Sequence, residues 1–171
     1  LHKEYRRQRQ MCIRDSHPDI ARELVRLFKT RFYLARKLNA DDLHDKQHKL
    51  EQAILGALDN VAVLNEDRIL RRYLDLIKAT LRTNFYQPDA SGENKGYFSF
   101  KFDPSAITDL PRPVPKFEIF VYSPRVEGVH LRFGNVARGG LRWSDREEDF
   151  RTEVLGLVKA QQVKNAVIVP V

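Results

Sequence analysis

Residues 126–171 read VEGVHLRFGNVARGGLRWSDREEDFRTEVLGLVKAQQVKNAVIVPV, and the rest of the chain is organised around this stretch. An alternating apolar run leads into Arg138-Gly139-Gly140, a helix-like run follows, and a second apolar run begins just after Lys164. The paired glycines let a small anionic ligand approach bare backbone, because no Cβ stands in the way. If the helix runs out over a sheet and returns, Arg138 and Lys164 face one cleft. Two fixed cations in one cleft suit a substrate with two carboxylates.

Three motifs in this stretch resemble those of the large NAD-specific glutamate dehydrogenases of bacteria. They are Ala137–Asp145 (ARGGLRWSD), Phe150–Leu157 (FRTEVLGL) and Val163–Val171 (VKNAVIVPV). The resemblance is long and ungapped from Phe117 to Val171 and thins toward His17, which makes it far more specific than a lone Arg-Gly-Gly. It implies an oxidoreductase that oxidatively deaminates L-glutamate to 2-oxoglutarate and ammonia with NAD.

The resemblance also implies roles for individual residues. Arg138 stands where shorter relatives have a lysine that pairs with a substrate carboxylate, and Lys164 matches a second carboxylate-binding lysine. Arginine offers a planar fork where lysine offers a point charge, so it stays open which carboxylate each cation binds. Gly139 and Gly140 are expected to be backbone that approaches the substrate. These four residues form the predicted substrate site, with no catalytic, cofactor-binding or metal-binding residue expected in the chain.

The remaining chemistry is expected outside these 171 residues. The resemblance places a catalytic lysine in a glycine-rich segment directly after Val171, and an NAD-binding Rossmann-type domain further on. No Gly-x-Gly-x-x-Gly fingerprint occurs in the sequence. The chain is therefore predicted to be an inactive fragment of a cytoplasmic, homo-oligomeric parent.

The composition is that of a globular protein, with 42% hydrophobic and 31% charged residues. No apolar run is long enough to cross a bilayer, so no membrane partner is expected. The formal charge is +7, but beyond residue 16 the basic residues are interleaved with acidic ones, which argues against a nucleic-acid partner. The single cysteine, Cys12, excludes an internal disulfide.

The apolar pattern predicts a mixed α/β fold. Three amphipathic helices with short links, an antiparallel bundle or part of one, are expected. The first opens at Pro18 and has apolar positions to Phe32, the second restarts at residues 39–42 and has an apolar stripe to Val61, and the third runs from a cap at Asn65 to Leu81. Strands are predicted at 97–102, 117–122 and 129–133, the last two as a hairpin, and at 167–169. A further helix is expected to follow an N-cap at Ser144.

Four regions follow from this pattern. Residues 1–16 are predicted to be a non-native or disordered tail, because they are basic and polar with little periodicity. Residues 17–87 form a helical segment, and the Pro/Gly/Ser-containing stretch 88–96 is the predicted linker. Residues 97–171 are the expected start of the substrate-binding domain.

Simpler interpretations of the same residues stay open. Arg138-Gly139-Gly140 also suits a surface turn, and Lys164 also suits a helix C-terminus, where a cation favours the dipole. His44 and His48 have the i, i+4 spacing of a metal pair, but an exposed polar face is favoured because no third ligand is evident. Trp143 is expected to pack against the sheet. The competing function is a non-catalytic helical regulatory, assembly or anion-binding module.

Overall fold

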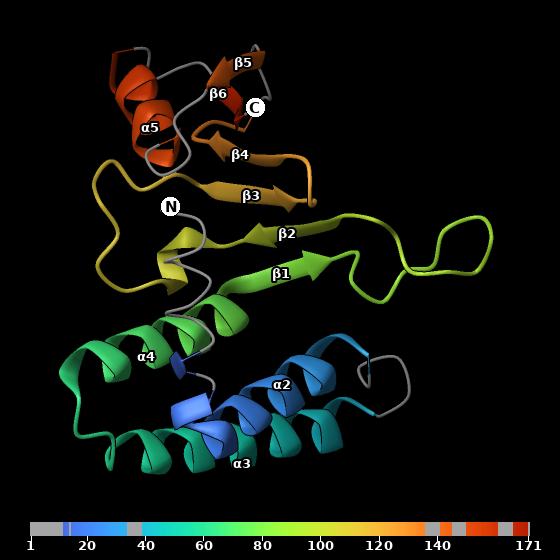
Figure 1. The fold of residues 1–171 in the computed structure, drawn as a ribbon, viewed down its shortest axis with the longest axis vertical. Coiled ribbons are helices and arrows are strands. Elements are labelled where there is room, and N and C mark those ends of the chain that lie inside the picture. The colour runs from blue at the N-terminus through green and yellow to red at the C-terminus, as the bar shows by residue number, and fades with distance from the viewer. Residues whose placement is uncertain are drawn as a thin grey trace. The chain divides into compact units, whose positions relative to one another are not determined.

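The computed structural model describes residues 12–13, 15–33, 39–135, 141–144, 150–160 and 166–170. The chain forms two compact units, Leu1–Lys78 and Ala79–Val171. The first unit is helical, and the second contains a sheet and a helix (Figure 1). The mixed α/β class predicted from the sequence is confirmed.

Three helices account for most of the described part of the first unit. They are α2 (Pro18–Phe32), α3 (Ala40–Leu58) and α4 (Leu64–Ala79), whose last residue belongs to the second unit. Their apolar stripes meet in one core, in which Leu27 and Ile54 are completely buried. The buried members of this core are Ile13, Ile20, Leu24, Leu27, Ile54, Leu58, Leu70 and Leu74. Burial of this apolar surface is the main stabilising contribution to the unit.

Local signals start these helices close to the predicted positions. Pro18 is the first residue of α2, where its missing N–H leaves no intrahelical bond unmade. Asn39 caps α3 by accepting a hydrogen bond from the Asp42 N–H at 2.8 Å. Helix α4 begins at Leu64, one residue before the predicted cap Asn65.

The predicted N-terminal tail, residues 1–16, differs from the structure at Ile13. The Ile13 side chain is 5% exposed and belongs to the core of the first unit. Its carbonyl accepts a hydrogen bond from the His17 N–H at 3.0 Å. Because an apolar side chain is stabilised by leaving water, the folded part of the chain includes Ile13.

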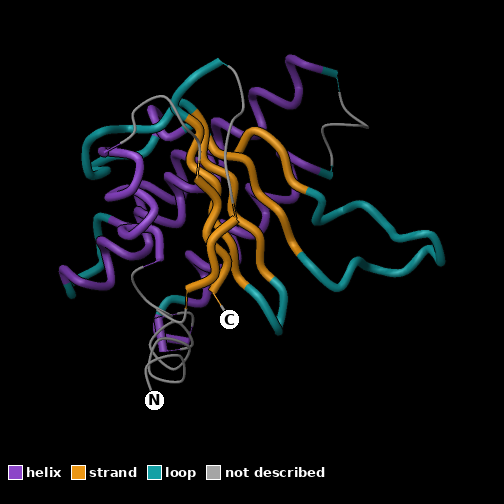
Figure 2. Tube along the Cα trace, turned by 90° about the horizontal axis from the view of Figure 1, so that it is seen from above, coloured by secondary structure: helices purple, strands orange, loops and turns teal. Residues whose placement is uncertain are grey.

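The second unit is built on a six-stranded sheet with the order β1-β2-β3-β4-β6-β5. The strands run side by side in Figure 2. All neighbours are antiparallel except β5 and β6, which are parallel. The predicted hairpin of β3 and β4 is confirmed. The strands are β1 (Thr80–Thr83), β2 (Phe98–Phe102), β3 (Phe117–Tyr122), β4 (Glu127–Arg132), β5 (Leu141–Ser144) and β6 (Ala166–Pro170).

The third predicted helix was wrong at its end, because residues from Thr80 onward form β1. The predicted linker 88–96 therefore lies between β1 and β2, two neighbouring strands of one sheet. Its Asp89 carboxylate accepts hydrogen bonds from the N–H groups of Ser91 and Glu93 at 2.8 and 3.1 Å, which orders the loop. The compact units divide earlier, after Lys78, because β1 pairs with β2.

Helix α5 (Phe150–Ala160) follows β5 and leads to β6, so these elements form a β-α-β unit. Its Val154 and Leu155 are buried with Val129 and Leu131 of β4. Ser144, predicted to cap this helix, is instead the last residue of β5. Its hydroxyl donates to Glu153 of α5 at 2.9 Å. We call the side of the sheet that carries these contacts the α5 face.

The core of the first unit predicts a clear difference between two neighbouring positions. Leu27→Ala should lower the free energy of unfolding by about 2–5 kcal/mol, because truncation leaves a cavity among packed side chains. Val25, two residues earlier in α2, is 66% exposed, so Val25→Ala should change the free energy of unfolding by less than about 0.5 kcal/mol. Urea denaturation of the 171-residue chain, followed by circular dichroism, measures both. Equal losses in the two variants would contradict the assigned core.

Candidate functional site

The four predicted substrate-binding residues lie outside the described part of the chain. Arg138, Gly139 and Gly140 fall within residues 136–140, and Lys164 falls within 161–165. The structure does describe the elements on either side of both segments. The first segment connects the end of β4 and a short turn to β5, and the second connects α5 to β6.

The described strand ends next to these segments share one edge of the sheet. Strands β5 and β6 are parallel with Leu141 opposite Val167, so both begin at the same edge. Strand β4 is antiparallel to β6, with Leu131 opposite Ala166, so β4 ends at that edge. We call it the entry edge and define it by Arg132, Leu141 and Ala166.

Two cations bind the turn that follows β4 at the entry edge. Phe117 pairs with Arg132, which brings the start of β3 to this edge, and the Lys116 N–H donates to the Arg132 carbonyl at 2.7 Å. The Lys116 ammonium donates to Oδ1 of Asn135. Arg132 donates from Nε to the Gly134 carbonyl at 3.0 Å and from Nη2 to the Asn135 carbonyl. The turn Gly134–Asn135 is thus held by two charged side chains.

Glu118, the residue of β3 after Phe117, binds α5. Arg151 donates from Nε to Oε1 of Glu118 at 2.9 Å and from Nη2 to Oε2 at 2.8 Å. The Glu118 and Arg151 side chains are 12% and 27% exposed. A bidentate pair with this little exposure is stronger than an ordinary surface ion pair. It adds a directional contact to the apolar packing of α5.

Positive charge gathers on the face of the sheet opposite α5. Residues directly opposite each other in neighbouring strands share a face, which places Lys101, Phe117, His130 and Arg132 together. The Lys101 ammonium lies 4.0 Å from the centre of the Phe117 ring, a cation–π contact. Within the described ranges, no ion pair involves Lys101, Lys116 or Arg132. The entry edge therefore favours an anionic ligand.

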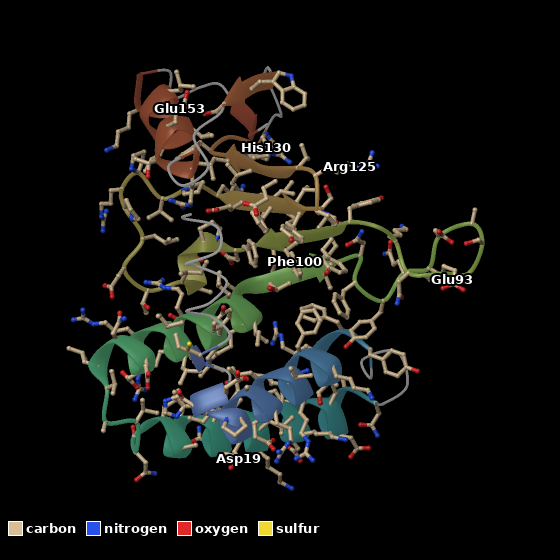
Figure 3. The ribbon with its side chains drawn as sticks, in the orientation of Figure 1. Asp19, Glu93, Phe100, Arg125, His130 and Glu153 are labelled. Carbon is tan, nitrogen blue, oxygen red and sulfur yellow. The ribbon has the colours of Figure 1, made fainter. Side chains whose placement is uncertain are left out.

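The surroundings of His130 disfavour its positively charged form. Partial burial lowers the pKa of His130 below its usual value of 6.5, and the charge of Arg132 lowers this pKa further. Both causes disfavour the imidazolium form. Figure 3 shows His130 on β4 and Glu153 on α5.

Trp143 is 62% exposed rather than packed against the sheet as predicted. Its neighbour Ser144 contacts α5, so strand alternation directs Trp143 to the opposite face. No group of three His, Cys, Asp or Glu side chains that could hold a metal ion occurs among the residues described, which include His44 and His48. The same residues contain no helix long and apolar enough to cross a membrane.

Comparison with known proteins identifies similar sequences. A family model described as bacterial NAD-glutamate dehydrogenase, catalytic domain, matches residues 53–171. The NAD-specific glutamate dehydrogenase of Pseudomonas aeruginosa is 87% identical over 157 residues, which cover 92% of this chain and 10% of that protein. The NAD-specific glutamate dehydrogenase of Halomonas elongata is 63% identical over 155 residues, which cover 91% of this chain and 9% of that protein. The Mycobacterium tuberculosis protein is 52% identical over 158 residues, 92% of this chain and 10% of its own length. The chain thus spans about a tenth of the curated relatives it matches.

The contact between Glu118 and Arg151 predicts a measurable coupling energy. In a double-mutant cycle with Glu118→Ala and Arg151→Ala, the coupling should be about 1–3 kcal/mol, because both charges lose a bidentate partner. The matched control is the exposed pair Arg22–Asp19, at 3.0 Å with side chains 61% and 86% exposed, whose coupling should be smaller. Urea denaturation of the six variants supplies the energies. A coupling no larger than that of the control pair would contradict the role given to this contact.

The environment of His130 predicts a pH dependence with a definite sign. Its pKa, measured by NMR titration, should lie below 6.5, and Arg132→Met should raise it without restoring 6.5, because burial is the larger cause. Between the lowered pKa and 6.5 the unfolded chain binds more protons at this position, so stability should rise with pH across that window. A pKa at or above 6.5 in the folded chain would refute this description.

Proposed function

Because the chain belongs to the bacterial NAD-specific glutamate dehydrogenase family, we propose that its parent oxidatively deaminates L-glutamate to 2-oxoglutarate and ammonia with NAD. The family match over residues 53–171 and the 87% identity to a relative of that name support this proposal. We further propose that residues 79–171, the second unit, begin the substrate-binding domain. The β-α-β unit and the cationic entry edge are the features that suit this role.

In this proposal, Arg138 and Lys164 bind the two carboxylates of glutamate, and Gly139 and Gly140 let the substrate approach the backbone. The observation that carries it is the register of β5 and β6. Arg138 precedes Leu141 by three residues, Lys164 precedes Val167 by three, and Leu141 and Val167 are directly paired. Three residues of chain span at most about 10 Å, and neighbouring strands lie about 4.8 Å apart. Both cations are therefore within chain reach of one small ligand.

Holding both carboxylates fixes the position and orientation of the α-carbon between them. Orientation of this kind can lower a reaction barrier by up to about 7–11 kcal/mol. The positive charges of Lys101, Lys116 and Arg132 lie at the same edge and raise the local concentration of a dicarboxylate. The chain's own contribution to the reaction is thus substrate binding and orientation.

The β-α-β unit of this chain does not fit NAD. A dinucleotide-binding turn presents glycines and helix N–H groups to the pyrophosphate. Here the residues between β5 and α5 read Asp-Arg-Glu-Glu-Asp, and their carboxylates would repel a pyrophosphate. We therefore assign NAD binding to another part of the parent, and we propose that the 171-residue chain alone is inactive.

Kinetics of the full-length parent test the substrate site. Lys164→Ala and Arg138→Ala should each lower kcat/KM for glutamate at least about tenfold, because losing one partner of a buried charge pair typically costs about 2–5 kcal/mol. Arg138→Lys should be milder because it keeps the charge. The KM for NAD should barely change, since we assign the cofactor to another part of the protein.

Two controls make this test decisive. Lys159→Ala removes an exposed cation from α5 and should leave kcat/KM unchanged. Melting temperatures separate a loss of substrate binding from a loss of folding. Near-normal kcat/KM in Lys164→Ala would sink the site assignment, and so would a loss explained wholly by unfolding.

A further inference from the structure

We infer that the start of β3 positions both predicted substrate-binding segments. Lys116 holds the turn that leads to Arg138, and Glu118 holds the helix that leads to Lys164. The two side chains are thus positioning residues that act through other groups. This inference rests on the proposed function.

The first contact fixes the turn Gly134–Asn135 against the sheet. Three oxygen acceptors of this turn, the carbonyls of Gly134 and Asn135 and the Asn135 side-chain oxygen, receive donors from Arg132 or Lys116. Hydrogen bonds from a charged donor are stronger than those between neutral groups. The two cations are themselves linked, because the Lys116 N–H donates to the Arg132 carbonyl at 2.7 Å.

Chain continuity connects this turn to the predicted site. Arg138 follows Asn135 by three residues, so a displacement of the turn displaces the start of the segment that carries Arg138. The neighbouring β3–β4 ladder gives the turn a rigid support, with Phe117 opposite Arg132. A mispositioned binding group far from the reacting atoms can still lower activity strongly.

The second contact fixes α5 against the same part of the sheet. The carboxylate of Glu118 receives two hydrogen bonds from Arg151 in the first turn of α5. Glu153, two residues after Arg151 in this helix, accepts a hydrogen bond from Ser144 of β5. Helix α5 ends at Ala160, four residues before Lys164, so its position limits where the Lys164 segment begins.

A purely electrostatic role is the competing explanation for Lys116, because any cation at this edge would attract a dicarboxylate. Lys101 separates the two explanations. It lies on the same face and contacts the Phe117 ring, but none of its described contacts reaches the turn or α5. Lys101→Met therefore removes one positive charge from the edge and leaves both positioning contacts intact.

The experiment is steady-state kinetics of the full-length parent with Lys116→Met, Lys116→Arg, Lys101→Met, Arg138→Ala and the double variant Lys116→Met/Arg138→Ala. Lys116→Met should raise the KM for glutamate about tenfold and leave the KM for NAD unchanged, because it displaces one substrate cation. Lys116→Arg should raise the KM for glutamate much less, since it keeps a charged donor. Lys101→Met should raise the KM for glutamate much less than Lys116→Met does, because it removes one charge from the edge but leaves both positioning contacts in place. The double variant should be no worse than Arg138→Ala, because both changes act through one group.

The Glu118 arm has its own variants. Glu118→Gln keeps the shape of the side chain but removes the charge that Arg151 binds, and it should also raise the KM for glutamate about tenfold. In a double variant with Lys164→Ala, Glu118→Gln should raise the KM for glutamate little further. In a double variant with Arg138→Ala, the free-energy effects of the two changes should add. This pattern of additivity would not arise from a general loss of stability.

Three results would overturn the inference. They are an equal effect of Lys101→Met and Lys116→Met, a normal KM for glutamate in both Lys116→Met and Glu118→Gln, and a parallel rise of the KM for glutamate and for NAD. Failure of the proposed function looks different, because Arg138→Ala and Lys164→Ala would then themselves be near normal. If Arg138→Ala raises the KM for glutamate and Lys116→Met does not, the positioning role of Lys116 is refuted and the proposed function stands.

Discussion

The parallel pairing of β5 with β6 is the constraint on which the second unit depends. Neighbouring parallel strands need a crossover connection, so the chain after β5 must cross the sheet and return before β6 can pair. Helix α5 makes that crossing, and its apolar side covers β4. The same pairing requires both strands to begin at one edge. The proposed substrate site depends on that requirement, because each predicted substrate cation precedes one of the two paired strands.

The entry edge concentrates positive charge, which is unfavourable in itself because like charges repel. The structure offsets this repulsion locally. Lys101 lies over the Phe117 ring, and Lys116 and Arg132 donate to oxygens of the following turn. Among the described residues, each cation is thus held by neutral groups, and no carboxylate there neutralises its charge. A carboxylate partner would fix the same side chains more strongly but would cancel the field, so this arrangement suits a surface that attracts a dicarboxylate.

The sequence predicts those features that depend on short-range pattern. Helical spacing located α2 and α3, and the Ser-Pro-Arg turn located the β3–β4 hairpin. Strand β1 was missed because Leu81 continues the apolar spacing of α4, and β5 was missed because it has only four residues after two glycines. The pair Glu118–Arg151 joins residues 33 positions apart, and no local pattern encodes such a partner. Arg138 and Lys164 were recognised by motif, but the register that relates the strands after them had to come from the structure.

We propose that Arg138 and Lys164 bind one substrate from the starts of two paired strands. A structure of the full-length parent with bound 2-oxoglutarate tests it most directly. In that structure, each of the two cations should lie within hydrogen-bond distance of a different carboxylate, about 2.7–2.9 Å for charged partners, with the Gly139–Gly140 backbone alongside. A structure in which either side chain points away from the bound dicarboxylate, or in which the ligand lies at another edge of this sheet, would contradict it.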